Sequence, residues 1–582
     1  MQKKSMVIWN VCLLALAFLM LAETRIAHAQ PGFGQMKKQW LLPKNPSGSY
    51  DLKLDRNLAY LHSTKSDSFD GLWRSQGYGY IVAIDSTEFL VYQVTGVSLM
   101  PWIAGTVADD SLFIDDIPLG TLSQSGDTLI FTRVDDNVIR FTSIDTLPPI
   151  TAPTADPELN FEVFWHSFEE NCALFTLTNV DWKATYNQYR PRVTATTTEA
   201  ELFGIFAEMV TPLKDGHTFI FDGNTAFFSP GPTPASVWIH PRFNEFLDVI
   251  TSILDGGELK TAANDLFLYG TIKQSIGYLN ILAYSGYSEN GDLLSETAFF
   301  SENLDMILTE FQNLEALIID IRWNGGGIDF LGLALASRLT DQRRLGHSKQ
   351  ARFGGYDEFT GLHHRYFAPE GVPFLNKPVI LLTSGNTASA ADLQAMILKN
   401  LPNVMLIGET TYGIFSDILP RNLPNGWFFG LSNERFLSRE GIDYEQIGIP
   451  PDIKVIANED SLNAGIDNIL SRALRELMIT SVSSPENEVP KTFALAQNYP
   501  NPFNPETVIR YQLPVVSEVR LTIFNALGQE IRALVNGRQS PGQKSAVWDG
   551  KNDLGNQVNS GVYFYKLKAD DRVQTKKMLL MR

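Results

Sequence analysis

The sequence contains few cysteines, few histidines and less positive than negative charge. Its 582 residues include 2 cysteines and 8 histidines, and neither a Cys-x-x-Cys nor a His-Glu-x-x-His pattern is present. The chain lacks the usual ligand sets of zinc sites, so no metal or other cofactor is predicted. The 47 Lys and Arg residues against 65 Asp and Glu residues give a formal net charge of −18. An acidic surface repels nucleic-acid phosphates, so no nucleic-acid partner is expected.

Long apolar runs are also scarce, and the clearest one lies at the start of the chain. Val11–Ala22 follows two lysines, Lys3 and Lys4, and precedes Ala27-His28-Ala29, which is the order of parts in a cleaved secretory signal peptide. We expect residues 1–29 to be removed on export; an uncleaved membrane anchor is the alternative. One of the cysteines lies in this segment, so the exported chain would have one thiol and no internal disulfide. No later run is long enough to span a bilayer, so no transmembrane helix is expected after cleavage.

Residues 30–150 are predicted to form an all-β domain. Short runs rich in β-branched and aromatic residues, such as Tyr78–Ile84, alternate with turn signals such as Gly126-Asp127. Prolines at 148, 149 and 153 mark the boundary with the next part of the chain.

Helical segments and then an α/β layer are expected after this domain. Leu159–Phe175 and Thr198–Leu213 carry apolar residues at helical spacing, which predicts a helical lead-in domain over residues 151–215. Over residues 216–480, unbroken apolar runs such as Ala316–Ile319 predict strands covered on both faces. A second such run is Val379–Leu382. The accompanying helical segments are Leu304–Phe311, Leu331–Arg338 and Ala388–Lys399. Alternation of this kind is typical of an α/β layer.

A second all-β part is predicted at the end of the chain. Residues 481–491 are polar and contain prolines, which indicates a linker. Residues 492–582 contain stretches such as Val519–Phe524 that alternate with period two, and glycines recur at hairpin spacing. This pattern favours a β-sandwich of the Ig-like kind.

The strongest candidate site residue is Ser389. An apolar strand ends at Thr383 and a helix begins near Ser389, with small residues on both sides that leave the hydroxyl approachable. The N–H group of Ala390, at the start of this helix, could stabilise a developing oxyanion. The alternative is structural, because Ser389 and Asp392 have the spacing of a helix capping box.

A glycine-rich turn is the second candidate. Asp320–Gly327 reads Asp-Ile-Arg-Trp-Asn-Gly-Gly-Gly and follows directly on a predicted strand. Glycines allow a backbone to approach another group closely and to turn its N–H groups toward it. Gly325 or Gly326 could therefore supply the second oxyanion donor; the alternative is a plain strand-to-helix turn.

His217 and Glu445 complete the set of candidates. His217 lies in an Asp-Gly-His-Thr segment, and Glu445 precedes Gly-Ile-Pro-Pro-Asp. A carboxylate can orient a histidine that acts as a general base. The alternatives are a structural histidine and a solvated loop acid. The adjacent pair His363-His364 cannot hold one metal from a regular element, so it is interpreted as part of a loop.

Taken together and in this order, the segments resemble the tail-specific serine peptidases, the family of the C-terminal processing proteases and the tricorn core protease. The resemblance covers about residues 155–475. It implies an α/β catalytic core of the ClpP/crotonase-like spiral type. It also implies that Ser389 is the nucleophile and that Ala390, with Gly325 or Gly326, forms the oxyanion hole.

The resemblance also distinguishes between two branches of that family. The processing branch activates its serine with a lysine after Gly-Glu-x-Thr-x-Gly; here that stretch is Gly408–Gly413, and Ile414 follows. Isoleucine cannot accept a proton, so a Ser–Lys dyad is excluded at this position. The tricorn-like branch uses a histidine and a glutamate, at places that His217 and Glu445 match. Its serine before the histidine is replaced here by Gly216, so a Ser-His-Glu triad without that auxiliary group is implied.

The C-terminal part resembles the sorting domain of type IX secretion substrates. The similarity rests on Gln497–Pro505, Trp548-Asp549-Gly550 and Lys576–Leu580. It implies a Gram-negative bacterium, export to the periplasm, passage through the outer membrane by the type IX machinery, and a secreted or cell-surface protein. A stabilising or carbohydrate-binding module is the alternative.

The sequence therefore predicts a secreted serine-type peptidase that hydrolyses protein or peptide substrates through an acyl-enzyme. Three alternatives remain open at this point. They are a catalytically inactive peptide- or ligand-binding protein on the same fold, an esterase with the same triad, and a surface adhesin whose function lies in the N-terminal β-domain.

Overall fold

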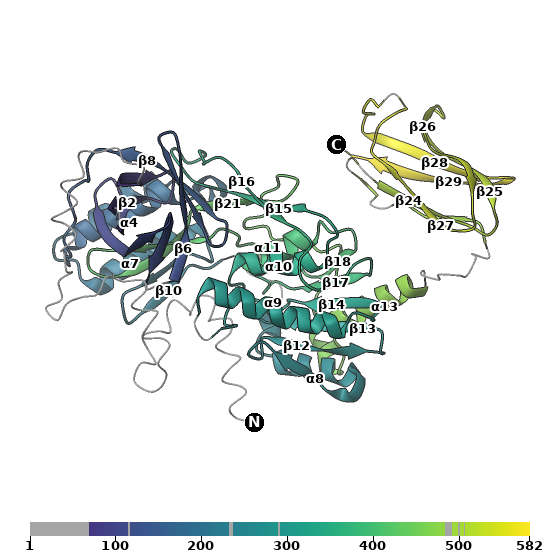
Figure 1. Cartoon of the computed structure of the whole chain (residues 1–582), viewed down its shortest axis with the longest axis horizontal. Helices are drawn as coiled ribbons and strands as arrows, with labels where there is room; N and C mark the ends of the chain where they lie inside the picture. The colour runs from purple at the N-terminus through teal and green to yellow at the C-terminus, as the bar shows by residue number, and fades with distance from the viewer. Residues whose placement is uncertain are drawn as a thin grey trace. The chain divides into compact units, whose positions relative to one another are not determined.

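The structure is a computed structural model that describes residues 69–581, apart from residues 86, 115–116, 232–236, 289–290, 483–491, 499–500, 504, 506 and 554. The chain divides into two compact units, Met1–Met478 and Ile479–Arg582 (Figure 1). The expected signal peptide over residues 1–29 and most of the expected linker over 481–491 lie outside the described residues.

The first unit opens with a closed eight-stranded barrel, drawn in purple and blue in Figure 1. Neighbouring strands are antiparallel, and the last strand pairs with the first through Leu72 and Ile144. Alternate side chains point inward, so Trp73, Phe89 and Phe141 are buried in the barrel core. The strands are β1 Gly71–Ser75, β2 Tyr80–Asp85, β3 Glu88–Val94, β4 Leu99–Ala108, β5 Ser111–Ile114, β6 Ile117–Ser125, β7 Thr128–Arg133 and β8 Val138–Ile144.

Helices follow the barrel, as the sequence predicts, but the first is shorter than expected. The helices are α4 Pro157–Asn171, α5 Phe175–Thr178, α6 Trp182–Tyr189 and α7 Glu199–Val210. The continuous helix expected to reach Phe175 was a wrong prediction, because the backbone turns to an extended conformation at Cys172. Thr198 forms a capping box with Glu201 at the start of α7. These helices share one core with barrel residues Tyr80 and Trp102.

A seven-stranded sheet forms the centre of the unit, in the order β11-β12-β13-β14-β17-β18-β22. The strands are β11 Lys260–Ala262, β12 Phe267–Ile272, β13 Ile276–Ile281, β14 Ala316–Asp320, β17 Val379–Thr383, β18 Val404–Gly408 and β22 Ile453–Lys454. Strands β13 to β22 are parallel, and every residue of β14 and β17 is buried. Unbroken apolar runs are required there because both faces of the sheet are covered.

Helices cover the two faces of this sheet. One core contains buried residues of α9 Leu293–Glu310, α10 Asp329–Arg338 and α11 Ala390–Leu398; the other contains residues of α8 Phe243–Ile253, α12 Glu459–Asn463 and α13 Asn468–Val482. Helix α9 begins well before the expected Leu304, at a start that Asp292 caps. This start was missed because the outer face of the helix carries exposed apolar residues, Leu294 and Phe299. The ClpP/crotonase-like spiral stays a prediction.

Two smaller sheets join the barrel side of the unit to the central sheet. One has the order β10-β9-β20-β19 and the other β16-β15-β21. Their strands are β9 Phe219–Phe221, β10 Ala226–Phe228, β19 Ile418–Asn422, β20 Phe428–Ser432, β15 Arg344–Ala351, β16 His363–Phe367 and β21 Glu434–Leu437. His363 and His364 therefore lie in a strand; their interpretation as loop residues was wrong, because β16 pairs with β15 at this point.

The second unit consists of two antiparallel sheets with the orders β23-β24-β27 and β26-β25-β28-β29. Their strands are β23 Ala494–Leu495, β24 Thr507–Leu513, β25 Ser517–Asn525, β26 Glu530–Gln539, β27 Gly542–Trp548, β28 Gly561–Ala569 and β29 Arg572–Leu580. Trp548 is fully buried in the core that the two sheets share, as expected for a β-sandwich. In the part of the chain that the structure describes, no helix combines the length and apolar character needed to cross a bilayer.

Candidate active site

Ser389 lies between the end of β17 and the start of α11, in a strained conformation. Its φ is +57° and its ψ is −122°, a region that non-glycine residues rarely occupy. Its N–H donates to Asp392 Oδ2 at 2.9 Å, in the capping arrangement that the sequence indicated. Because β14 and β17 are adjacent parallel strands, the loops after them meet at one edge of the sheet. Ser389, in the loop after β17, and the glycine turn, in the loop after β14, thus lie at the same edge of the sheet.

His217 meets Ser389 across 172 residues of sequence. His217 Nε2 lies 3.1 Å from Ser389 Oγ, within hydrogen-bonding distance. His217 is buried, with 4% of its surface exposed, and it precedes β9, which pairs with β20. The structure thus brings together the two residues that the sequence had proposed as nucleophile and base.

Asp215 holds the turn that carries His217, a contact that sequence reasoning missed. Asp215 Oδ1 accepts hydrogen bonds from His217 N at 2.9 Å and from Ser432 Oγ at 3.0 Å. Its Oδ2 accepts one from Thr218 Oγ1 at 2.6 Å. The Asp-x-His spacing was the available signal, because an aspartate often accepts the amide two residues on. The Ser432 contact has no signal in the sequence.

Burial sets the protonation state of His217. Desolvation lowers the pKa of His217 below its ordinary value, while the charges of Asp215 and Asp417 and a polar contact with the Ser416 backbone oppose this effect. The net pKa is lowered, so the neutral imidazole predominates at pH 7 and can accept a proton.

Glu445 lies in the same buried region but makes no direct hydrogen bond to His217. Its Oε2 accepts the amides of Phe415 and Ser416 at 2.9 and 3.0 Å. Its Oε1 is buried without a hydrogen-bond partner among the described residues, and the buried His217 Nδ1 makes no contact there beyond the polar one with the Ser416 backbone. Burial, followed by the charge of Asp215, raises the pKa of Glu445 well above its ordinary value. The Ser416 backbone contacts both Glu445 and His217.

The glycine turn packs directly against the serine. A Cβ atom on Gly326 would lie 2.7 Å from Ser389 Cβ and 3.0 Å from Ala390 N, and its φ of +108° also favours glycine. The Gly326 N–H donates to Asn324 Oδ1 at 2.8 Å. The N–H groups of Gly325 and Ala390 donate no hydrogen bond to any described residue. Two amide donors are thus available near the serine hydroxyl.

The position expected to hold a lysine in the processing branch is filled by an apolar contact. Ile414 is buried, and its amide donates to Asp392 Oδ2 at 3.1 Å, beside the Gly413 amide on Oδ1 at 2.9 Å. A Cβ atom on Gly216 would lie 3.3 Å from the Ile414 side chain. The Ile414 side chain therefore occupies the space that a side chain at position 216 would need. Burial raises the pKa of Asp392 to about 7, although the amides it accepts lower it.

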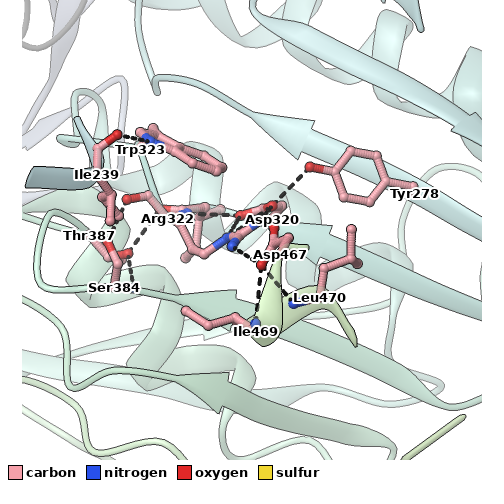
Figure 2. A network of polar contacts seen from close by, with 11 residues as sticks. Ile239, Tyr278, Asp320, Arg322, Trp323, Ser384, Thr387, Asp467, Ile469 and Leu470 are labelled. Atoms are coloured by element: carbon pink, nitrogen blue, oxygen red, sulfur yellow. Dashed lines mark hydrogen bonds and ion pairs between the residues drawn. The ribbon is translucent and has the colours of Figure 1, made fainter. Parts of the chain in front are cut away.

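A buried ion pair holds the glycine turn and the serine loop together. Figure 2 shows Arg322 between Asp320 and Asp467, with Nη2 2.7 Å from a carboxylate oxygen of each. The Arg322 carbonyl accepts a hydrogen bond from Ser384 Oγ, and the Ile321 carbonyl accepts one from Thr387 Oγ1 at 2.9 Å. The loops after β14 and β17 are thereby tied to each other and to the start of α13.

The fold and the site define the class. A serine hydroxyl and a buried neutral imidazole meet at the carboxyl ends of parallel strands, beside free amide donors, which is the arrangement of a serine hydrolase. Within the described residues, no group of three or more His, Cys, Asp or Glu side chains is arranged to hold a metal ion.

Comparison with known families gives the particular kind of hydrolase. Residues 275–455 match Peptidase family S41, residues 153–211 match the Tricorn protease C1 domain, and residues 506–572 match the FlgD Ig-like domain. Residues 275–455 are thus similar to the peptidase domain of family S41. Ser389 and Glu445 lie within this range, whereas His217 lies outside it.

Similar proteins agree with this family. A chloroplastic C-terminal processing peptidase of Tetradesmus obliquus is 26% identical over 188 residues, 32% of this chain and 36% of that protein. The tricorn protease of Thermoplasma volcanium is 27% identical over 177 residues, 30% of this chain and 16% of that protein. The chain thus spans little more than a third, or less, of these relatives. A predicted peptidase of Parabacteroides merdae with a crystal structure is 28% identical, has a TM-score of 0.50, and is covered completely by 57% of this chain.

Proposed function

We propose that the protein is a serine peptidase that cleaves protein or peptide substrates with Ser389 as nucleophile and His217 as general base. The observation that carries the proposal is the 3.1 Å contact between His217 Nε2 and Ser389 Oγ. Ser389 lies within the residues that match Peptidase family S41. A buried imidazole with a lowered pKa is suited to accept the serine proton.

The reaction follows from this geometry. Ser389 Oγ attacks the substrate carbonyl while its proton passes to His217 Nε2, and His217 then donates that proton to the leaving amine. The Ala390 amide supplies one oxyanion donor. For the second we propose Gly325, because Asn324 already holds the Gly326 amide. Water then hydrolyses the acyl-enzyme. Loss of one oxyanion donor would raise the activation free energy by roughly 3 kcal/mol.

Glu445 is proposed as the third member of a tricorn-like triad. Glu445 Oε1 is buried and unpaired among the described residues, and the buried His217 Nδ1 has only its polar contact with the Ser416 backbone; buried polar groups of this kind are normally well satisfied. A small movement that joins them would satisfy both, and catalytic hydrogen bonds often tighten only when substrate binds.

Labelling with a fluorophosphonate probe tests the assignment. The wild-type chain is expected to label at Ser389, whereas Ser389→Ala and His217→Ala are not; Glu445→Gln should label more slowly than wild type. Undiminished labelling of Ser389→Ala would reject the nucleophile. Absence of labelling in the wild type would favour an inactive binding protein. Turnover of ester but not peptide substrates would favour an esterase.

Export is a second part of the proposal. The predicted signal peptide over residues 1–29 and the C-terminal sandwich over 492–582, of which residues 506–572 match an Ig-like domain, support export to the periplasm and type IX passage to the cell surface or medium. In a bacterium that has this system, deletion of residues 492–582 should retain the protein in the periplasm. Unchanged release of the deleted protein would contradict the sorting role.

A further inference from the structure

A cluster of charged side chains outside the triad joins the N-terminal barrel to the peptidase domain. Lys349 Nζ on β15 lies 2.7 Å from Asp417 Oδ2 and 3.0 Å from Glu434 Oε2. Tyr78, in the turn between β1 and β2 of the barrel, donates from its hydroxyl to Glu434 Oε1 at 2.6 Å. Asp329, the first residue of α10, hydrogen-bonds to Asp417. We call these five residues the Lys349 cluster.

The cluster is connected to the triad through Ser416. The Ser416 hydroxyl accepts the Glu434 amide at 3.0 Å and donates to the Asp417 carbonyl at 3.0 Å. The Ser416 amide donates to Glu445, and the Ser416 backbone also contacts His217. Lys349 and its partners thus fix the segment that lies against both the base and its proposed carboxylate.

The cluster also contributes charge to the base. The groups that act on His217 are Asp215 on its own turn, and Asp417 with the Ser416 backbone on the segment before β19. Burial alone would raise the pKa of Asp417, but Lys349 holds it well below its ordinary value. Asp417 is therefore an anion near the imidazole, although its side chain is 37% exposed and solvent screens part of its effect.

The other acids of the cluster are held differently. Burial and then the charge of Asp417 raise the pKa of Asp329, and burial raises that of Glu434 to about 7 although Lys349 opposes it. The positive charge of Arg133, on β7 of the barrel, also interacts with the charges of Asp417 and Glu434. A single lysine among three acids thus keeps one of them, Asp417, ionised.

We propose that the Lys349 cluster, completed by Tyr78 from the barrel, is a positioning element of the active site that aligns segment 415–417 and supplies the charge of Asp417 to His217. This inference rests on the proposed role of Ser389 and His217. It makes the barrel part of the catalytic machinery, because Tyr78 is its contribution to the cluster.

Two variants of the full chain test the proposal. Asp417→Asn removes the charge with little change in shape, and Tyr78→Phe removes one hydrogen bond and keeps the ring that stacks on Tyr80. Tyr186→Phe is the matched control, because Tyr186 also donates to a glutamate, Glu162, at 2.9 Å, but in the helical part. Thermal unfolding of each variant verifies that it is folded.

Two readouts keep the inference separate from the proposed function. The first is the pKa of His217, from NMR titration of the ¹³C-labelled histidines with His217→Ala for assignment; Asp417→Asn should lower it. The second is the rate of fluorophosphonate labelling, which Tyr78→Phe should reduce about threefold or more while Tyr186→Phe leaves it unchanged. An unchanged His217 pKa in Asp417→Asn, or equal behaviour of the two tyrosine variants, would overturn the proposal. A shifted pKa in a chain that never labels would retain the charge coupling and reject the peptidase.

Discussion

At the scale of single residues, the contact between Gly326 and Ser389 leaves no room for a side chain. Gly326→Ala would place a Cβ atom 2.7 Å from Ser389 Cβ at a φ of +108°, so either the turn or the nucleophile must move. We expect the labelling rate of Ser389 to fall about 100-fold, because small misplacements of reacting groups have effects of this size. Gly204→Ala in α7 is the control, since a Cβ there meets nothing within 4 Å. Equal rates in the two variants would contradict the close packing.

The lowered pKa of His217 predicts a specific pH dependence. Since the folded pKa lies below the ordinary value of 6.5, the base stays neutral as the pH falls to 6.5 and is lost only below it. The acid limb of kcat/KM should therefore lie below pH 6.5. The unfolded chain binds this proton more readily than the folded one, so the His217 contribution to stability should also decrease as the pH falls through this window.

Measurement of kcat/KM between pH 4 and 8 would check this expectation. His166→Gln should leave the acid limb in place, because His166 lies on α4 in a partly exposed pair with Glu170. An acid limb above pH 6.5 would show that the charges around His217 outweigh its burial.

Residues of the site were predictable where their signal is local. Ser389, Gly326 and His217 each lie in a short motif beside a predicted strand or helix. The contacts that hold them are not local: Ser432 reaches Asp215 across 217 residues and Tyr78 reaches Glu434 across 356. Side-chain partners at such separations depend on how whole elements pack, and a single sequence has no pattern for them.

At the scale of elements, the Arg322–Asp467 pair is expected to dominate the stability of the loops around the site. Arg322 and Asp467 are both buried, and the Asp467 carboxylate also accepts the Ile469 and Leu470 amides at the start of α13. Asp467→Asn removes half of the charge that balances Arg322, and we expect the free energy of unfolding to fall by about 3 kcal/mol.

Urea denaturation followed by tryptophan fluorescence would measure that loss. Glu208→Gln breaks an exposed pair with Arg192 and should change the free energy of unfolding by less than about 1 kcal/mol. Similar losses in the two variants would mean that Asp320 alone is enough to balance Arg322.

Elements were predicted best where burial on both faces imposes a continuous pattern. The runs that became β14 and β17 are examples. The start of α9 and strand β16 were missed because neither has an apolar pattern that follows its burial. In α9 the apolar residues Leu294 and Phe299 are exposed, and β16 is a short strand that carries two histidines. In both, the apolar pattern does not report which face is covered.

At the scale of the whole molecule, the division into two units predicts that the peptidase unit folds without the C-terminal sandwich. A chain ending at residue 491 keeps all of α13 and every residue of the proposed triad. Its labelling at Ser389 and the midpoint of its thermal unfolding transition should match those of the full chain. Loss of labelling on truncation would show that the sandwich supports the fold of the peptidase unit.

The shared core of barrel and helices was not predictable from the sequence. The sequence indicates a boundary near residues 148–153, but Tyr80, Met100 and Trp102 pack into one core with α4 and α7. Apolar patterns predict that a face is covered without naming what covers it.

The separation of Arg322 and Asp467 has a consequence for synthesis of the chain. These two residues are 145 positions apart, so the guanidinium has its second counter-ion only after nearly the entire peptidase unit has been made. A nascent or prematurely terminated chain would pair Arg322 with Asp320 alone and would lack the link from the glycine turn to the start of α13, so we expect it to form that loop poorly. We therefore expect the loops around Ser389 to assemble completely only after the start of α13 has been made.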